Sequence, residues 1–176
     1  MVEGQPFHMK EFKKLLIDNI PRLMRYATAL VGNAKVAEDL AHDCLEYALE
    51  NHGSWDSSKN FKTWLHTQIH YVFVVQYGQN KIFPFADLSF EDLSPLKNAT
   101  EMDHVSMREL INALAKLPPE QKEILLLVTL EGMDYKQIGE IMEIPVGSVM
   151  SRLHRARKHL RILMYASDES KSVALD

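Results

Sequence analysis

The chain has 176 residues, of which 46% are hydrophobic and 25% charged, and its formal net charge is -4 at pH 7. That apolar content is enough to form packed cores, which excludes a chain that is disordered throughout. The single cysteine, Cys44, cannot form an internal disulfide, and the longest apolar stretches are far too short to span a bilayer. No signal segment precedes Phe12. We therefore expect a soluble protein of the reducing cytoplasm.

Apolar residues recur at helical spacing through most of the chain, so the predicted fold class is all-α. Charge then divides the sequence into zones. Residues 1–81 carry nine Lys or Arg and nine Asp or Glu, residues 82–106 carry one and five, and residues 107–165 carry nine and seven. We predict two small helical domains, 1–81 and 107–165, joined by an acidic linker over 82–106 and followed by a tail over 166–176.

The first domain is predicted to hold four helices. Residues 9–19 form a short one, and Pro21 suits the first turn of a second helix that Gly32 ends. A third helix covers residues 34–50, and a fourth runs from Phe61 to about Tyr77.

The predicted helix over residues 34–50 carries acidic side chains in an arc beside its apolar side, among them Asp39, Asp43 and Glu46. Most acidic arcs of this kind are solvated helix faces. A docking surface is the alternative, and composition alone does not choose between the two.

A loop before the fourth helix contains Trp55, and the helix itself opens with Phe61, Trp64 and Leu65. The helical spacing of the last three predicts that they are core residues, whereas Trp55 is left without an explanation. Farther along this helix, His66 and His70 stand four residues apart. No third ligand has metal-site spacing, so we expect no metal and no cofactor.

The second domain is predicted to start with a helix over 108–116 and to continue with one over 120–130, ended by Gly132. Asp134 followed by Gln137 resembles a capping box at the start of a third helix. Within that helix, Gly139 is the small residue that a helix-turn-helix needs where its helices approach closely.

The last predicted helix is basic: Met150 to Arg161 contains five Lys or Arg and no acid. Its apolar residues form one narrow stripe at helical spacing, namely Val149, Leu153, Ala156 and Leu160. We expect this stripe to be buried and the opposite face to meet the phosphates and bases of duplex DNA. Nothing in the sequence resembles a catalytic constellation, so we expect no enzyme.

Two sets of residues carry a family resemblance. The set in the second domain comprises residues 117–132, Asp134-Tyr135, Gln137-Ile138-Gly139 and residues 145–149 and 151–157. The set in the first domain comprises Ala37-Glu38-Asp39-Leu40, Asp43 and the Phe61, Trp64, Leu65 cluster. With them the chain resembles the extracytoplasmic-function (ECF) sigma factors of the sigma-70 family, the first domain their region 2 and the second their region 4.

This resemblance implies a dissociable subunit of bacterial RNA polymerase that directs the core enzyme to specific promoters. Its expected partners are the core enzyme, through the coiled coil of the largest subunit and the flap, then promoter DNA and an anti-sigma factor. Asp39, Asp43 and Glu46 would dock on the coiled coil. The -35 element would be contacted by residues of the basic helix and its start: Gly147, Ser148, Met150, Ser151, Arg152, His154, Arg155 and Lys158.

In relatives, the loop before the aromatic cluster holds a flipped base of the -10 element. The resemblance therefore assigns single-strand capture to Trp55, Ser57, Ser58, Lys59 and Asn60.

The sequence departs from the family pattern at two places. Met150 stands where relatives usually carry Lys or Arg, and residues 68–80 contain no Lys or Arg where relatives have an Arg-rich run that engages -10 DNA. The second departure motivates an alternative function, a sigma-like mimic that sequesters an anti-sigma factor without initiating transcription. Such mimics are fused to a phosphorylatable receiver, and the residues after Tyr165 are too few to form one. A simple helix-turn-helix regulator is a third reading, but it leaves the acidic helix without a role.

Overall fold

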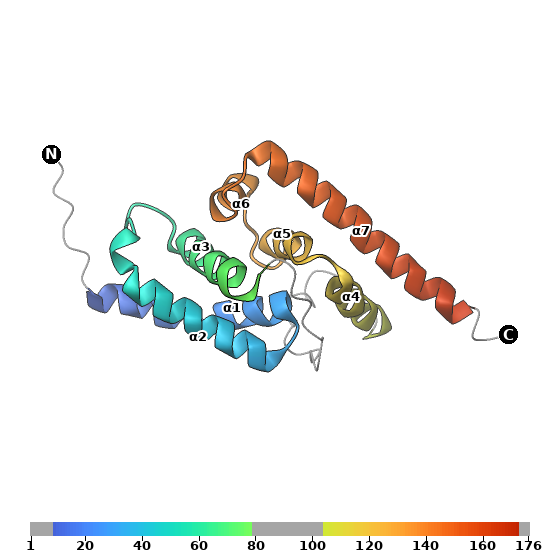
Figure 1. Ribbon diagram of the computed structural model, residues 1–176, viewed down its shortest axis with the longest axis horizontal. Coiled ribbons are helices and arrows are strands. Elements are labelled where there is room, and N and C mark those ends of the chain that lie inside the picture. The colour runs from blue at the N-terminus through green and yellow to red at the C-terminus, as the bar shows by residue number, and fades with distance from the viewer. Residues whose placement is uncertain (1–8, 79–103, 173–176) are drawn as a thin grey trace.

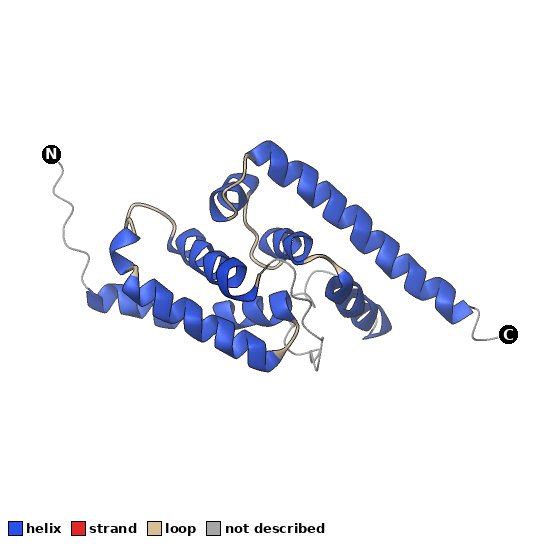
Figure 2. Cartoon of the chain, viewed as in Figure 1, coloured by secondary structure: helices blue, strands red, loops and turns tan. Residues whose placement is uncertain are grey.

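A computed structural model describes residues 9–78 and 104–172, and within these ranges the chain is helical and has no strand (Figure 1, Figure 2). The elements are α1 (Met9–Val31), α2 (Ala34–Glu50), the short η1 (His52–Ser54), α3 (Phe61–Val72), η2 (Phe73–Tyr77), α4 (His104–Lys116), α5 (Pro119–Thr129), α6 (Tyr135–Ile141) and α7 (Val146–Ser172). The all-α prediction is confirmed. Most of the predicted linker lies outside the described residues, and residues 104–106 of it begin α4.

The prediction of two helices before residue 32 is wrong, because α1 runs without interruption from Met9 to Val31 and contains Pro21. Proline lacks the N–H that would bond to the carbonyl of Ile17. Both residues lie on the exposed side of α1, where water can hydrate that carbonyl. Leu16 and Leu23 are buried on the other side, and their packing holds the helix together across the missing bond.

Helices α1, α2 and α3 form the first layer of the fold, with α1 packed on α2 and α2 on α3 (Figure 1). Asn33 caps α2 through its side chain, and Asn60 does the same for α3. The core of this layer includes Tyr26, Leu40 and Leu65. Cys44 is also buried here, and burial raises the pKa of its thiol to about 12, which keeps it protonated.

The second group of helices has α7 as its long element, which packs against α4, α5 and α6 (Figure 1). Between α5 and α6 the chain turns at Gly132, whose φ is +62°, two residues beyond the C-cap at Leu130. Asp134 and Gln137 form the predicted capping box at the start of α6. Helices α6 and α7 and the turn between them form the helix-turn-helix.

The two groups of helices pack on one another, α3 against α6 and α1 against α5. Their buried apolar side chains form one connected cluster that extends from Phe12 to Ala156. The described part of the chain is thus closed, with α6 beside the helices that precede it. The domain boundaries predicted from charge stay a prediction, because residues 79–103 are not described.

Gly139 fixes the approach of the two helix-turn-helix elements. A Cβ at this position would lie 2.8 Å from the backbone oxygen of Ile144, and the backbone N–H of Ile144 donates to the carbonyl of Gly139 at 3.0 Å. The obstacle is backbone, which cannot rotate aside as a side chain would.

We expect Gly139→Ala to destabilise the chain by about 1–3 kcal/mol, the typical cost of overpacking a tight contact. Urea unfolding monitored by circular dichroism measures this loss. Gly53→Ala is the matched control, because a Cβ there meets no atom within 4 Å. Equal stabilities of the two variants would contradict the close approach.

Candidate nucleic-acid interface

The basic helix has the two faces that its spacing predicts. Val149, Leu153 and Ala156 are buried, and Leu160 is half-buried beside them. The opposite face is open to solvent and comprises Met150, Ser151, His154, Arg155, Arg157, Lys158 and Arg161. His159 anchors the helix from the side, because its Nδ1 lies 3.0 Å from Oε1 of Gln121 on α5.

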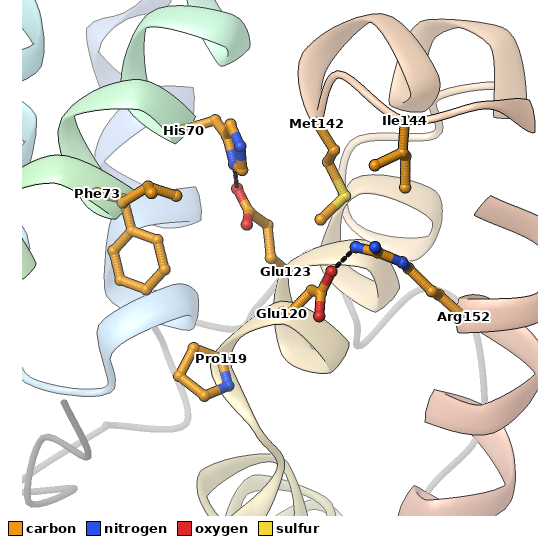
Figure 3. A pocket seen from close by; sticks show the side chains of 9 residues that line it. His70, Phe73, Pro119, Glu120, Glu123, Met142, Ile144 and Arg152 are labelled. Carbon is orange, nitrogen blue, oxygen red and sulfur yellow. Dashed lines mark hydrogen bonds and ion pairs between the residues drawn. The ribbon is translucent and has the colours of Figure 1, made fainter. Parts of the chain in front are cut away.

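Arg152 differs from the other cations of α7, because it forms an ion pair with Glu120 of α5 (Figure 3). Its guanidinium is therefore already partnered within the fold, whereas Arg155 and Lys158 have no ion pair among the described residues. A phosphate contact by Arg152 would have to compete with Glu120.

Some hydrogen-bonding groups at the start of α7 also have partners within the fold. The backbone N–H of Ser148 donates to the carbonyl of Pro145 at 2.8 Å, so this N–H is already partnered within the fold. The hydroxyl of Ser151 donates to the carbonyl of Ser148 at 3.1 Å, and both side chains reach solvent.

Side-chain hydrogen bonds hold the loop before α3 in a defined turn. Oδ1 of Asp56 accepts from the backbone N–H and the hydroxyl of Ser58, at 2.9 and 2.7 Å, and these bonds lower the pKa of Asp56. Oδ1 of Asn60 accepts from the N–H groups of Lys62 and Thr63. Two of the five predicted capture residues, Ser58 and Asn60, therefore also shape the loop, while Ser57 and Lys59 are exposed.

Trp55 packs edge-on against Phe61, with ring centroids 5.2 Å apart, and lies beside Trp64. The predicted core position is confirmed for Phe61 and Leu65, which are buried, whereas Trp64 is half-buried and packs against the core from its edge. The indole nitrogen of Trp55 is buried without a hydrogen-bond partner among the described residues. Its ring is thus fixed at the loop, as a platform for an unstacked base would be.

A cavity of about 610 Å³ adjoins this loop and is shared between the two groups of helices. Trp55, Lys59 and Asn60 line one side, while Lys136, Gln137 and Glu140 of α6 line the other. Three of the five predicted capture residues and the helix-turn-helix therefore face the same space in the closed chain.

The acidic arc of α2 lies on the outside of the molecule. Asp39 and Glu46 are exposed and Asp43 is half-buried. Lys35 donates to Asp39 at 3.0 Å, and this hydrogen bond raises the pKa of the exposed Lys35. Asp43 and Glu46 have no ion pair within the described ranges, so the arc keeps a net negative charge.

Polar contacts between the two groups of helices meet at Glu131, just after α5, whose side chain is 2% exposed. Its Oε2 lies 3.2 Å from Nζ of Lys62, 3.4 Å from Nε2 of His66 and 3.5 Å from Nε of Arg22. Lys62 also donates to the backbone carbonyl of Glu131. Burial alone would raise the pKa of Glu131, but His66 and Lys62 outweigh it and hold that pKa below its usual value.

A second polar contact joins α3 to α5 beside a cavity of about 290 Å³ (Figure 3). Nδ1 of His70 donates to Oε1 of Glu123 at 2.7 Å. Burial alone would lower the pKa of His70, but the hydrogen bond and the charges of Glu123 and Glu143 raise it above its usual value. Glu120 and Arg152 line the same cavity as an ion pair.

Sequence reasoning did not find these contacts. Their spacing suggests at most a metal site for His66 and His70, whereas the structure pairs each with a carboxylate that lies more than fifty positions away in the chain. The one available signal was that both histidines lie on one face of α3, four residues apart. No local pattern reveals that Glu131 and Glu123 would face them.

A buried stripe, a close approach at Gly139 and an exposed basic face define α6 and α7 as a DNA-reading helix-turn-helix. The family model described as "Sigma-70, region 4" matches residues 107–160. A second family model, described as the sigma2 domain of PhyR, matches residues 16–70.

Curated relatives agree with these matches. The chain is 33% identical over 147 residues to the ECF RNA polymerase sigma factor EcfG of Rhodopseudomonas palustris, covering 83% of this chain and 81% of that one. It is 28% identical over 144 residues to the ECF RNA polymerase sigma factor SigW of Bacillus subtilis, covering 75% and 77%. The chain therefore belongs to the ECF sigma factors of the sigma-70 family.

Solved structures support the fold. The sigma factor RpoE in complex with the anti-sigma factor NepR, from Bartonella quintana, superposes with a TM-score of 0.68 at 24% identity over 89% of this chain and 98% of that one. CnrH in complex with the cytosolic domain of CnrY gives a TM-score of 0.65 at 19% identity over 91% of each chain. Among the residues the structure describes, no helix is long and apolar enough to cross a membrane.

The pairing of His70 with Glu123 makes stability depend on pH. Because its pKa in the folded chain lies above the ordinary value of about 6.5, the folded state binds the proton more tightly than the unfolded state. The stabilisation is thus complete below that ordinary value and is lost as pH rises through the raised pKa. We expect the loss in unfolding free energy caused by His70→Gln to shrink as pH rises from about 6 upward.

Urea titrations of both proteins over a pH series measure this difference. The same comparison in a Glu123→Gln background is the control, and there the loss should no longer shrink as pH rises, because the hydrogen bond and charge that raise the pKa of His70 are removed. A loss that stays constant with pH in the native background would contradict the pairing.

Proposed function

We propose that the chain binds bacterial core RNA polymerase and directs it to specific promoters, acting in the cytoplasm where transcription takes place. The observation that carries this proposal is the exposed basic face of α7 on an intact helix-turn-helix, in a chain whose relatives are named ECF RNA polymerase sigma factors. Two exposed surfaces support the proposal. Arg155 is free to contact DNA, and the acidic arc of α2 is free to bind a basic partner.

In this proposal each site residue has one role. Arg155 makes a bidentate contact with a guanine, and Ser151, His154 and Met150 contact neighbouring bases. Lys158 and, after release from Glu120, Arg152 hold phosphates, while Gly147 and Ser148 lie at the phosphate backbone. Trp55, Ser57, Ser58, Lys59 and Asn60 receive an unstacked base of the -10 element. Asp39, Asp43 and Glu46 dock on the polymerase coiled coil.

One specific observation favours the second candidate, a mimic that binds an anti-sigma factor without initiating transcription. The profile that matches residues 16–70 is that of the sigma2 domain of PhyR. In addition, the outward residues of α3 and η2 include Tyr71 and Val75 and no Lys or Arg after Lys62. Contacts to -10 phosphates would be few on that surface.

In vitro transcription separates the two candidates. Core polymerase with this chain alone should produce specific transcripts from a library of promoters if the chain is a sigma factor. Core binding without initiation, or no core binding, would overturn the sigma-factor proposal and favour the mimic. An anti-sigma factor is a partner in both cases, as NepR is of the sigma factor RpoE in one of the solved structures.

The division between base and phosphate contacts predicts different losses for two exposed cations of α7. Arg155→Ala should cost about 1–3 kcal/mol of binding and relax the preference at one -35 position, because a bidentate base contact is lost. Lys158→Ala should weaken all sequences alike and reduce the slope of log K against log salt by about 0.9, the value of one phosphate contact.

Fluorescence anisotropy with cognate and scrambled -35 duplexes, at several salt concentrations, measures both effects. The two substitutions serve as controls for each other, since both remove a cation from the same helix face. Equal losses on the two duplexes for both variants would refute the assigned roles.

Docking through α2 predicts a charge effect. Asp43→Lys should weaken core binding, and the loss should be smaller at high salt, where the attraction is screened. Glu11→Lys on α1 is the control, because it makes the same change of charge outside the acidic arc. Pull-down of core polymerase at two salt concentrations gives the comparison, and equal losses in the two variants would count against the arc.

A further inference from the structure

The contact between the two groups of helices is specific rather than a chance apposition. One buried carboxylate, Glu131, meets basic side chains from two different helices, Arg22 on α1 and both Lys62 and His66 on α3. Nε2 of Gln137 on α6 donates to the hydroxyl of Thr63 at 3.0 Å.

These contacts place α6 against the loop that the proposed function assigns to -10 capture. Thr63 follows Asn60 by three residues, and Gln137 lies on α6 beside Lys136 and Glu140, which line the cavity at the loop. A strand of DNA that entered this cavity would meet α6 and its side chains. The loop is therefore partly covered in the closed chain.

The closed chain is also too short to read both promoter elements at once. Their names place them about 25 base pairs apart, which is about 85 Å of B-form DNA at 3.4 Å per base pair. Gln137 touches Thr63, and the 14 residues from Gln137 to Ser151 would reach only about 50 Å even if fully extended. In the helical chain the span is shorter still.

We propose that the contact of Glu131 with Arg22, Lys62 and His66 is an autoinhibitory latch, which keeps the free chain closed with α6 over the -10 loop until a partner opens it. The inhibitory role rests on the proposed function, whereas the closure is a property of the chain alone.

The contact is incompletely hydrogen-bonded, so the latch can reopen. Oε2 of Glu131, Nε2 of His66 and the hydroxyl of Tyr26 are buried without a hydrogen-bond partner of good geometry among the described residues. The ring of Tyr26 packs against His66, with centroids 4.8 Å apart. A closed state with unsatisfied polar atoms gains less from closing than a fully paired interface would, so binding of a partner can reverse it.

Glu131→Gln tests the latch, because it keeps the shape of the side chain and removes its charge. Both tryptophans of the chain, Trp55 and Trp64, line the cavity that α6 covers. We expect acrylamide to quench their fluorescence more strongly in the variant, and the radius of gyration from small-angle X-ray scattering to increase. Glu11→Gln makes the same chemical change at an exposed site and should leave both quantities at their wild-type values.

Two further variants keep the test decisive if Glu131→Gln does not fold. Lys62→Met removes a cation but keeps its apolar stem, and Thr63→Val removes the hydroxyl that accepts from Gln137. Circular dichroism identifies the folded variants. If the folded ones match Glu11→Gln in quenching and in radius of gyration, the latch is overturned.

Core polymerase provides the functional measurement. The acidic arc of α2 is exposed in the closed chain as well. Opening should nevertheless raise the apparent affinity of the variants for core on the order of tenfold, because the second group of helices can then bind core together with the first. Variants that open but bind core no more tightly would overturn the inhibitory role. Wild type and variants that all fail to bind core would overturn the proposed function, while fluorescence and scattering would still decide the closure.

Discussion

The arrangement of the described helices depends on one buried carboxylate and the basic side chains around it. Removing a charge from water is costly, and Glu131 is compensated only because α1 and α3 bring Arg22, Lys62 and His66 to the same point. These contacts join elements that are far apart in the sequence, and the apolar cluster around them is continuous across the two groups of helices. The relative position of the -10 loop and the helix-turn-helix follows from that pairing, and so does the shared cavity at Trp55.

Charged side chains are arranged differently at the junction between the two groups of helices and on the outer surfaces. At the junction, acids are paired with bases: Glu123 with His70, and Glu131 with Arg22, Lys62 and His66, while Glu120 and Arg152 pair beside the same cavity as His70. On the outer surfaces the charges are left unmatched, acidic on α2 and basic on α7. An acidic chain can therefore present a basic surface to DNA, because the two signs are separated on different helices.

Local rules predicted much of the fold. The stripe of Val149, Leu153 and Ala156, the capping box at Asp134 and the close approach at Gly139 each depend on residues within one or two helical turns. The failure at Pro21 has a tertiary cause, because buried neighbours outweigh a local helix breaker. The carboxylate contacts of His66 and His70 lay beyond sequence reasoning, since they join positions more than fifty residues apart and no periodicity encodes such a distance.

The same separation has a consequence during protein synthesis. Lys62 precedes Glu131 by 69 residues, which a ribosome takes roughly 3 to 14 s to add at the usual rates of elongation. For most of that interval the nascent chain already contains α1, α2, α3 and the loop at Trp55, but it contains neither the carboxylate that closes the molecule nor α6. Each newly made molecule therefore passes once through a state in which the loop is uncovered and Lys62 and His66 lack their carboxylate partner.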